Sequence, residues 1–304
     1  MKTALIKVRT TVPSPLDGAY IEMKGSLKEK LEKAFTYYNK IIFIGSMGIL
    51  VRMIQPFIES KVSDPAIIVV DEKLNYCIPV LSAHLGGGID LCQSLQREFG
   101  CTCVLTTSTD INQLTGIDLF AFRNKLVIED PKAILPLNSK LLNAPPLTVK
   151  GFPADFQVPT HYLPSKKQAD IGFESGGTVT NLQKQNLVLG VGFHNDMTAD
   201  ALMEAFANLI PKDFQKRILI LTSHEKKWHH RVFHEFARKC NIPDTEHFSN
   251  SSLSQAIHVL GLEERPVVKK YMGISHVASP SAYLASKKGR ELITIKGEKC
   301  KFSL

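Results

Sequence analysis

Short apolar runs, each followed by a polar or glycine-containing loop, recur through the first 110 residues. The run Ile41–Ile44 leads into Gly45-Ser46-Met47-Gly48 and a helical pattern, and the segments Ala66–Val70 and Tyr76–Leu81 continue the series. Fully apolar strands are typical of parallel sheets, which are buried on both faces. Strands that alternate with helices indicate a doubly wound, mostly parallel sheet. We therefore predict an N-terminal α/β domain over residues 1–112.

The remainder of the chain divides into two further parts. Seven prolines between positions 131 and 164 interrupt any regular pattern, so residues 113–185 are predicted to be an irregular middle domain or linker. A strand at 187–189 followed by Gly190-Val191-Gly192 opens a second, smaller α/β domain over residues 186–304. Asn195 stands where a dinucleotide fingerprint has its third glycine, which disfavours a nicotinamide cofactor.

The chain is basic, with a net charge of +8. Such a charge favours an acidic small molecule or a nucleic acid as the partner. Residues 212–239 hold eight Lys and Arg against three acidic residues, a run usually explained as a solvated helix face. The sequence has no nucleic-acid-binding motif, so we expect no nucleic-acid partner. An anion- or nucleic-acid-binding protein that uses this basic segment is the weakest of the alternatives.

The six cysteines show no Cys-x-x-Cys spacing. We interpret them as reduced thiols of a cytoplasmic protein, because no export signal accompanies them. No apolar run approaches the roughly 20 residues of a membrane span, so no membrane partner is expected. His230 and His234 are four residues apart and could share a metal, but no third ligand follows at a suitable spacing. We interpret them as surface histidines and expect no metal site.

The segment Cys77–Asp90 is the strongest single candidate for a site. An apolar run ends in Ser82-Ala83-His84, and Gly86-Gly87-Gly88 then lead into a helical pattern. Loops past the carboxyl ends of strands form ligand sites in α/β domains, and a histidine there exchanges protons near neutral pH. A glycine-rich turn with a capping histidine explains the same letters.

Four N-terminal segments, 43–52, 61–72, 81–87 and 105–110, resemble the cobalt-precorrin-5A hydrolase family of anaerobic cobalamin synthesis, the CbiG type. Farther along, Gly190-Val191-Gly192, Lys226-Lys227 and 273–278 fall in the order of that family. The resemblance implies an enzyme that opens the δ-lactone of a cobalt-bound tetrapyrrole and releases acetaldehyde. It also implies that the cobalt is carried by the substrate and that no cofactor is needed.

The resemblance implies roles for ten residues. We expect His84 to act as general base, with Asp64 or Asp71 orienting it, and we expect backbone N–H groups of Gly86 and Gly87 to bind the oxyanion. An alternative role for His84 is axial ligation of the substrate cobalt. Cationic residues are expected to bind the carboxylates of the macrocycle. The predicted substrate-binding residues are Gly45, Gly48, Arg52, Lys61, Gly86, Gly87 and Gly192.

The sequence also departs from the family pattern. Ala83 replaces a glycine, Phe193-His194-Asn195 replaces Cys-Arg-Arg, and His230 stands where a glutamate is common. A tetrapyrrole-binding homologue without turnover is therefore the alternative function. Candidate partners, beside the anionic cobalt-tetrapyrrole, are neighbouring cobalamin-pathway methyltransferases and a second copy of the chain. On the catalytic hypothesis, His84→Ala abolishes acetaldehyde release.

Overall fold

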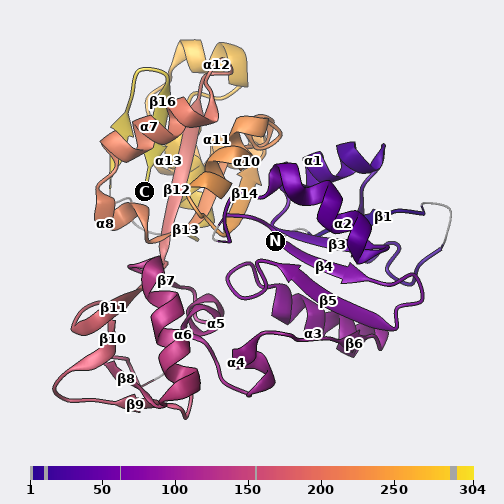
Figure 1. Cartoon of the computed structure of the whole chain (residues 1–304). Helices are drawn as coiled ribbons and strands as arrows, with labels where there is room; N and C mark the ends of the chain where they lie inside the picture. The colour runs from indigo at the N-terminus through magenta and orange to yellow at the C-terminus, as the bar shows by residue number, and fades with distance from the viewer. Residues whose placement is uncertain (1–2, 10–12, 62, 155, 288–292) are drawn as a thin grey trace. The chain divides into compact units, whose positions relative to one another are not determined.

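The computed structural model describes residues 3–9, 13–61, 63–154, 156–287 and 293–304. The chain divides into two compact units, Met1–Lys184 and Gln185–Leu304 (Figure 1). The first unit holds two sheets and the second holds one. None of the helices built from described residues has the length and hydropathy needed to cross a membrane.

The first sheet has six strands in the order β2-β1-β3-β4-β5-β6 (Figure 1). Strands β2, β1, β3 and β4 run parallel, β5 runs antiparallel to β4, and β6 is parallel to β5. The reversal at β5 decides which loops share an edge of the sheet. The strands are β1 (Thr3–Lys7), β2 (Ile21–Glu22), β3 (Lys40–Ile44), β4 (Ala66–Val70), β5 (Tyr76–Leu81) and β6 (Thr102–Cys103).

Helices cover both faces of this sheet. Residues of α1 (Leu27–Tyr37) and α2 (Met47–Ile54) pack with alternate residues of β3 and β4 on one face. Residues of α3 (Gly88–Phe99) pack on the other face. Each strand contributes side chains to both faces because successive residues of a strand point in opposite directions. The doubly wound, mostly parallel sheet predicted from the sequence is thus confirmed.

The middle of the chain forms a five-stranded sheet in the order β7-β11-β10-β8-β9. The sequence predicted an irregular segment here, whereas the structure shows a sheet. The sheet is possible because its strands are short and several of the prolines lie in the connections between them. Its helices are α4 (Ser108–Ile111), α5 (Ile117–Arg123) and α6 (Ile134–Asn143). Its strands are β7 (Leu126–Ile128), β8 (Leu147–Lys150), β9 (Tyr162–Pro164), β10 (Ala169–Phe173) and β11 (Gly177–Lys184). The exact boundaries of the three predicted domains stay a prediction.

The second unit is an α/β domain, as predicted, with the strand order β14-β13-β12-β16-β15. Strands β12, β13 and β14 are parallel, and the β15–β16 hairpin pairs antiparallel with β12. The strands are β12 (Leu187–Phe193), β13 (Ile218–His224), β14 (Asp244–Phe248), β15 (Thr294–Lys296) and β16 (Cys300–Ser303). The helices are α7 (Ala199–Leu209), α8 (Lys212–Gln215), α9 (Glu225–Trp228), α10 (Arg231–Lys239), α11 (Asn250–Val259), α12 (Pro266–Met272) and α13 (Ala278–Ala285).

Gly190 is expected to be essential for the close packing of α13 on β12. A Cβ atom at position 190 would lie 2.0 Å from the carbonyl oxygen of Ala278, so Gly190→Ala forces the helix away from the strand. We expect the variant to lower the free energy of unfolding of this unit by about 1–3 kcal/mol. Urea unfolding followed by the fluorescence of Trp228, the single tryptophan, measures the change.

Gly192→Ala is the matched control, because a Cβ there would lie 3.6 Å from Val277, an ordinary contact. Its effect on stability should stay within about 0.5 kcal/mol. Equal losses in the two variants would contradict the explanation by close packing.

Candidate active site

His84 is held between two carboxylates. Its Nδ1 lies 3.0 Å from Oδ2 of Asp118 and its Nε2 lies 3.0 Å from Oδ2 of Asp110. Burial lowers the pKa of His84, but the hydrogen bonds to Asp110 and Asp118 outweigh that effect and raise the pKa to about 9. At neutral pH the ring is therefore a cation that donates from both nitrogens. In this arrangement neither nitrogen is available to act as a base or to bind cobalt.

The two aspartates predicted to orient His84 have other functions. The carboxylate of Asp64 accepts hydrogen bonds from the backbone N–H groups of Glu59 and Ser60. That of Asp71 accepts from the N–H groups of Lys73 and Tyr76 in the β4–β5 turn. Burial raises the pKa of Asp71, yet these backbone hydrogen bonds outweigh it and the pKa is lowered. The predicted orienting role is therefore wrong, and Asp110 and Asp118 fill it.

The predicted N-terminal site residues lie at two edges of the first sheet. Because β5 is antiparallel to β4, the His84 loop lies where β3 and β4 begin, together with Lys61, whose carbonyl accepts a hydrogen bond from Ser82 Oγ. Gly45, Gly48 and Asp71 follow the carboxyl ends of β3 and β4. Strands of five residues span roughly 15 Å, so these groups do not form one site.

Arg52 lies at the same edge as Gly45, Gly48 and Asp71. Its guanidinium is 3.6 Å from the point at which a Cβ atom added to Gly48 would lie. The side chain of Arg52 is exposed. The sequence predicted loops at these positions in a mostly parallel sheet, and the antiparallel pairing of β5 with β4 separates the loops into two groups.

The glycines after His84 serve packing. The N–H groups of Gly86 and Gly87 donate to the carbonyls of Ser82 and His84, both at 3.0 Å, so they are not free to bind an oxyanion. Gly87 has a φ of +72°, and a Cβ there would lie 2.3 Å from the ring of Phe122 on α5. The predicted oxyanion role of these two groups is therefore corrected. The loop instead packs the first sheet against the middle of the chain.

A pocket of about 970 Å³ lies in the second unit, at the carboxyl ends of β12 and β13. This is the edge at which open α/β sheets bind ligands. Gly192 lines it, so this predicted site residue does face a cavity. The two other C-terminal segments in which the sequence resembles the family, Lys226-Lys227 and 273–278, also contribute residues to the lining. The lining comes from residues within 192–196, 226–230, 265–272, 275–278 and 296–301.

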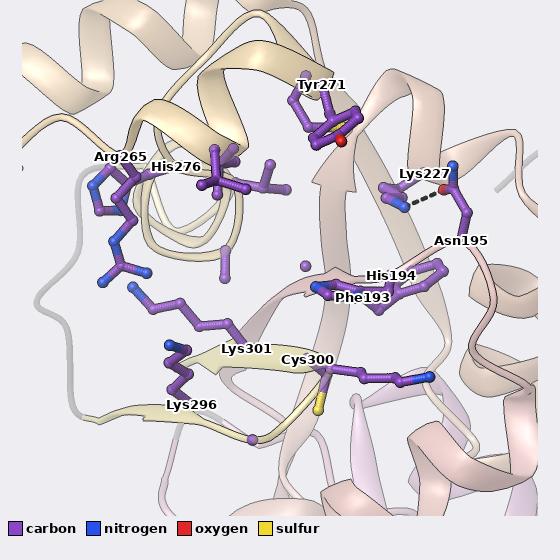
Figure 2. Close-up of a pocket in the computed structure, with 18 of the residues that line it drawn as sticks. Phe193, His194, Asn195, Lys227, Arg265, Tyr271, His276, Lys296, Cys300 and Lys301 are labelled. Carbon is purple, nitrogen blue, oxygen red and sulfur yellow. Dashed lines mark hydrogen bonds between the residues drawn. The ribbon is translucent and has the colours of Figure 1, made fainter.

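The pocket is strongly cationic. Six of its lining residues are lysine or arginine, and two are acidic. Figure 2 shows Arg265, Lys296 and Lys301 gathered on one side, with Lys227 on the opposite side. Lys299 is paired with Asp196 at 2.6 Å. Such a site favours a ligand with several separated negative charges.

One wall of the pocket is apolar. Val267, Val268, Tyr271 and Met272 of α12 line it, and Val267 and Tyr271 are 71% and 72% exposed. Exposed apolar side chains at a concave site are typical of a binding surface. The pocket therefore combines an apolar wall with cationic groups.

Lys227 is the most buried cation of the pocket, at 6% exposure. Its ammonium hydrogen-bonds Oδ1 of Asn195 and lies 4.8 Å from the ring centroid of Phe193 (Figure 2). Burial lowers the pKa of Lys227. None of the described salt bridges places a carboxylate on this ammonium, so an anionic ligand would gain more from it than from a solvated lysine.

His276 lines the pocket and is held in one tautomer. Its Nε2 lies 2.6 Å from the carbonyl oxygen of Glu263. A carbonyl only accepts, so Nε2 carries the proton and Nδ1 has the lone pair. Burial lowers the pKa of His276, which keeps the ring neutral at neutral pH. The sequence predicts no role for His276, although the residue lies in segment 273–278, one of the segments that resemble the family.

His230 and His234 do not form a metal pair. His230 caps α10 by accepting from the N–H of Val232, and it lines the pocket. His234 is buried, with its Nε2 2.6 Å from the carbonyl oxygen of Trp228. The interpretation of both as surface histidines is therefore wrong for His234.

Two family models match the chain. The model of the cobalamin synthesis G N-terminal domain matches residues 29–110, and that of the cobalamin synthesis G C-terminus matches residues 187–302. The chain belongs to the CbiG family. The C-terminal match includes most of the residues that line the cationic pocket.

Curated relatives carry the name cobalt-precorrin-5A hydrolase. One from Salmonella typhimurium is 36% identical over 125 residues, which is 41% of this chain and 36% of that protein. One from Priestia megaterium is 34% identical over 125 residues, covering 41% and 33%. The match thus spans about a third of the length of these two relatives. A protein from Methanocaldococcus jannaschii, named "Probable cobalt-precorrin-5A hydrolase", is 25% identical over 88% of this chain and 89% of its own.

Proposed function

We propose that this CbiG family member is a cobalt-precorrin-5A hydrolase, which opens the δ-lactone of its substrate and releases acetaldehyde. Membership in the family and the names of the curated relatives support the activity. The observation that carries the proposal is the cationic pocket with a neutral histidine and a buried lysine.

The shape and charge of the pocket suit the substrate. The macrocycle is a flat, largely apolar ring that carries several acetate and propionate carboxylates at its periphery. The apolar side chains of α12 offer a surface for the ring face, while Arg265, Lys296 and Lys301 are placed for the carboxylates (Figure 2). A volume of about 970 Å³ is at the upper end of small-molecule pockets.

His276 and Arg265 have the properties that lactone hydrolysis requires. Water attacks the lactone carbonyl carbon, and the neutral ring of His276 accepts the proton of that water at Nδ1. The carbonyl of Glu263 holds the ring in this tautomer. The guanidinium of Arg265, which lies beside His276 in Figure 2, stabilises the negative charge that develops on the carbonyl oxygen. Breaking the acyl carbon–oxygen bond then opens the ring, and the imidazolium of His276 gives its proton to the departing alkoxide. The alcohol so formed leaves as acetaldehyde when its carbon–carbon bond to the macrocycle breaks, and the electron pair of that bond and the alcohol proton pass to the macrocycle.

The remaining features of the proposal follow from the substrate. Cobalt arrives in the tetrapyrrole, and the reaction needs no cofactor of the protein. We place the enzyme in the cytoplasm, with methyltransferases of the same pathway and a second copy of the chain as candidate partners.

Incubation of the purified chain with cobalt-precorrin-5A tests the proposal. We expect stoichiometric acetaldehyde, detected by derivatisation, and a product with an opened lactone, detected by mass spectrometry. Binding of the corrinoid, seen as a change in visible absorbance, without any acetaldehyde would instead identify a binding homologue and overturn the hydrolase.

Lys227→Met is expected to weaken substrate binding. Methionine keeps most of the side-chain volume but removes the buried ammonium, and the loss of one partner of a buried charge pair costs at least about 2 kcal/mol. We expect the Kd for the corrinoid to rise about 30-fold, measured by absorbance titration.

Lys212→Met serves as the control, because Lys212 is an exposed member of the basic segment 212–239 that does not line the pocket. Equal weakening by the two variants would show that general charge attraction, rather than the pocket, binds the substrate.

A further inference from the structure

Three cysteine sulfurs meet inside the first unit, and a fourth contacts one of them. The Sγ atoms of Cys77, Cys92 and Cys103 all lie within 4.8 Å of one another. The Sγ of Cys77 lies 3.3 Å from that of Cys92 and 3.1 Å from that of Cys101. Cys77, Cys92 and Cys101 are buried, and Cys103 is partly exposed. The cluster is separate from the cationic pocket, which belongs to the other unit.

The fold brings these residues together through three ordinary contacts. Cys77 on β5 and Cys103 on β6 are register partners in adjacent strands. Cys101 stands two residues before Cys103, so in extended backbone the two side chains share a face. Helix α3 covers that face and contributes Cys92. Three consecutive elements of the chain, β5, α3 and β6, thus direct thiols to one point.

The sulfur distances show thiols in direct contact and not a disulfide. The thiols of Cys92 and Cys101 each donate a hydrogen bond to the Sγ of Cys77, at 3.3 and 3.1 Å. A disulfide bond, at about 2.05 Å, is much shorter. Tetrahedral bonds of about 2.3 Å to one ion place ligand sulfurs about 3.8 Å apart. The Sγ atoms of Cys77, Cys92 and Cys103, all within 4.8 Å of one another, are close enough to share such an ion.

We propose that Cys77, Cys92 and Cys103 bind one thiophilic metal ion, Zn²⁺ or Cu⁺. Thiolate ligands select these soft ions over Mg²⁺ or Ca²⁺. The ion would join β5, β6 and α3 and so stabilise the edge of the first sheet. This site goes beyond the proposed hydrolase activity and replaces the expectation of no metal and only free thiols.

Metal analysis of the full chain tests the proposal. After purification under reducing conditions and incubation with Zn²⁺ or Cu⁺ in separate samples, we expect one ion per chain to remain through gel filtration. The ion that survives competition with a chelator identifies the natural one. Substitution by Co²⁺ should give the intense thiolate-to-metal absorption of a sulfur site.

Cys92→Ser should lose the ion, whereas Cys240→Ser, which removes a thiol of the second unit, should keep it. Cys103→Ser, at the partly exposed ligand, is the second variant if Cys92→Ser does not fold. Retention of the ion by both ligand variants would overturn the proposal. The absence of stoichiometric metal would also overturn it. A chain mass lower by two hydrogen atoms, which indicates a disulfide within the cluster, would do the same.

Discussion

Replacing His276 with glutamine is expected to lower the kcat for acetaldehyde release by about 100-fold or more. The glutamine amide can still donate to the carbonyl of Glu263, so the local structure should persist, but it has no basic nitrogen. KM should change little, because the cationic groups that bind the carboxylates remain. Steady-state kinetics with cobalt-precorrin-5A separates the two constants.

The pH dependence gives a second readout for His276. Burial lowers the pKa of this residue from 6.5, so the catalytic, neutral form persists below that value and kcat should fall only in more acidic solution. This fall of kcat in acidic solution, the acidic limb of the pH profile, should be absent in His276→Gln. His258→Gln, at an exposed residue of α11 outside the pocket, should keep both the rate and the limb. A His276→Gln enzyme with near-normal kcat would exclude His276 as the base.

Replacing His84 with alanine is expected to destabilise the first unit by about 3–5 kcal/mol. The variant leaves Asp110 and Asp118 buried without the cation that pairs with them. Hydrogen exchange measured by mass spectrometry should rise in peptides that cover α4 and α5. The fluorescence of Trp228, which lies in the other unit, should show an unchanged transition.

The His84 cluster also predicts how stability depends on pH. The pKa of His84 is raised from 6.5 to about 9, so between these values the folded chain holds a proton that the unfolded chain releases. The contribution of the raised His84 pKa to the free energy of unfolding is on the order of 3 kcal/mol. This contribution is complete below pH 6.5 and is lost as the pH rises through about 9. Protection of α5 should decline over this range in the natural chain but not in His84→Gln.

These measurements separate the two roles considered for His84. The catalytic hypothesis also expects His84→Ala to abolish acetaldehyde release, but without added exchange in α4 and α5. The double variant His84→Gln/Asp118→Asn removes one unpaired charge and should recover part of the stability. Loss of activity with normal protection would refute the structural role described above.

The sequence alone was sufficient for the fold class and the family. Apolar runs such as Ile41–Ile44 indicate strands that are buried on both faces of a sheet. Such signals are local and survive without tertiary contacts. The family motifs likewise identified the C-terminal segments that line the pocket, although they assigned a role only to Gly192.

Only the tertiary structure decided where the chemistry lies. The direction of β5 depends on pairing with β4, and no local pattern records it, yet it places His84 at the edge opposite Gly45. The partners of His84 lie 26 and 34 residues away in sequence, and the Glu263 carbonyl that leaves Nδ1 of His276 basic lies 13 residues away. Protonation states and cavities arise from such non-local contacts, because burial and charge pairing exist only once the chain has folded.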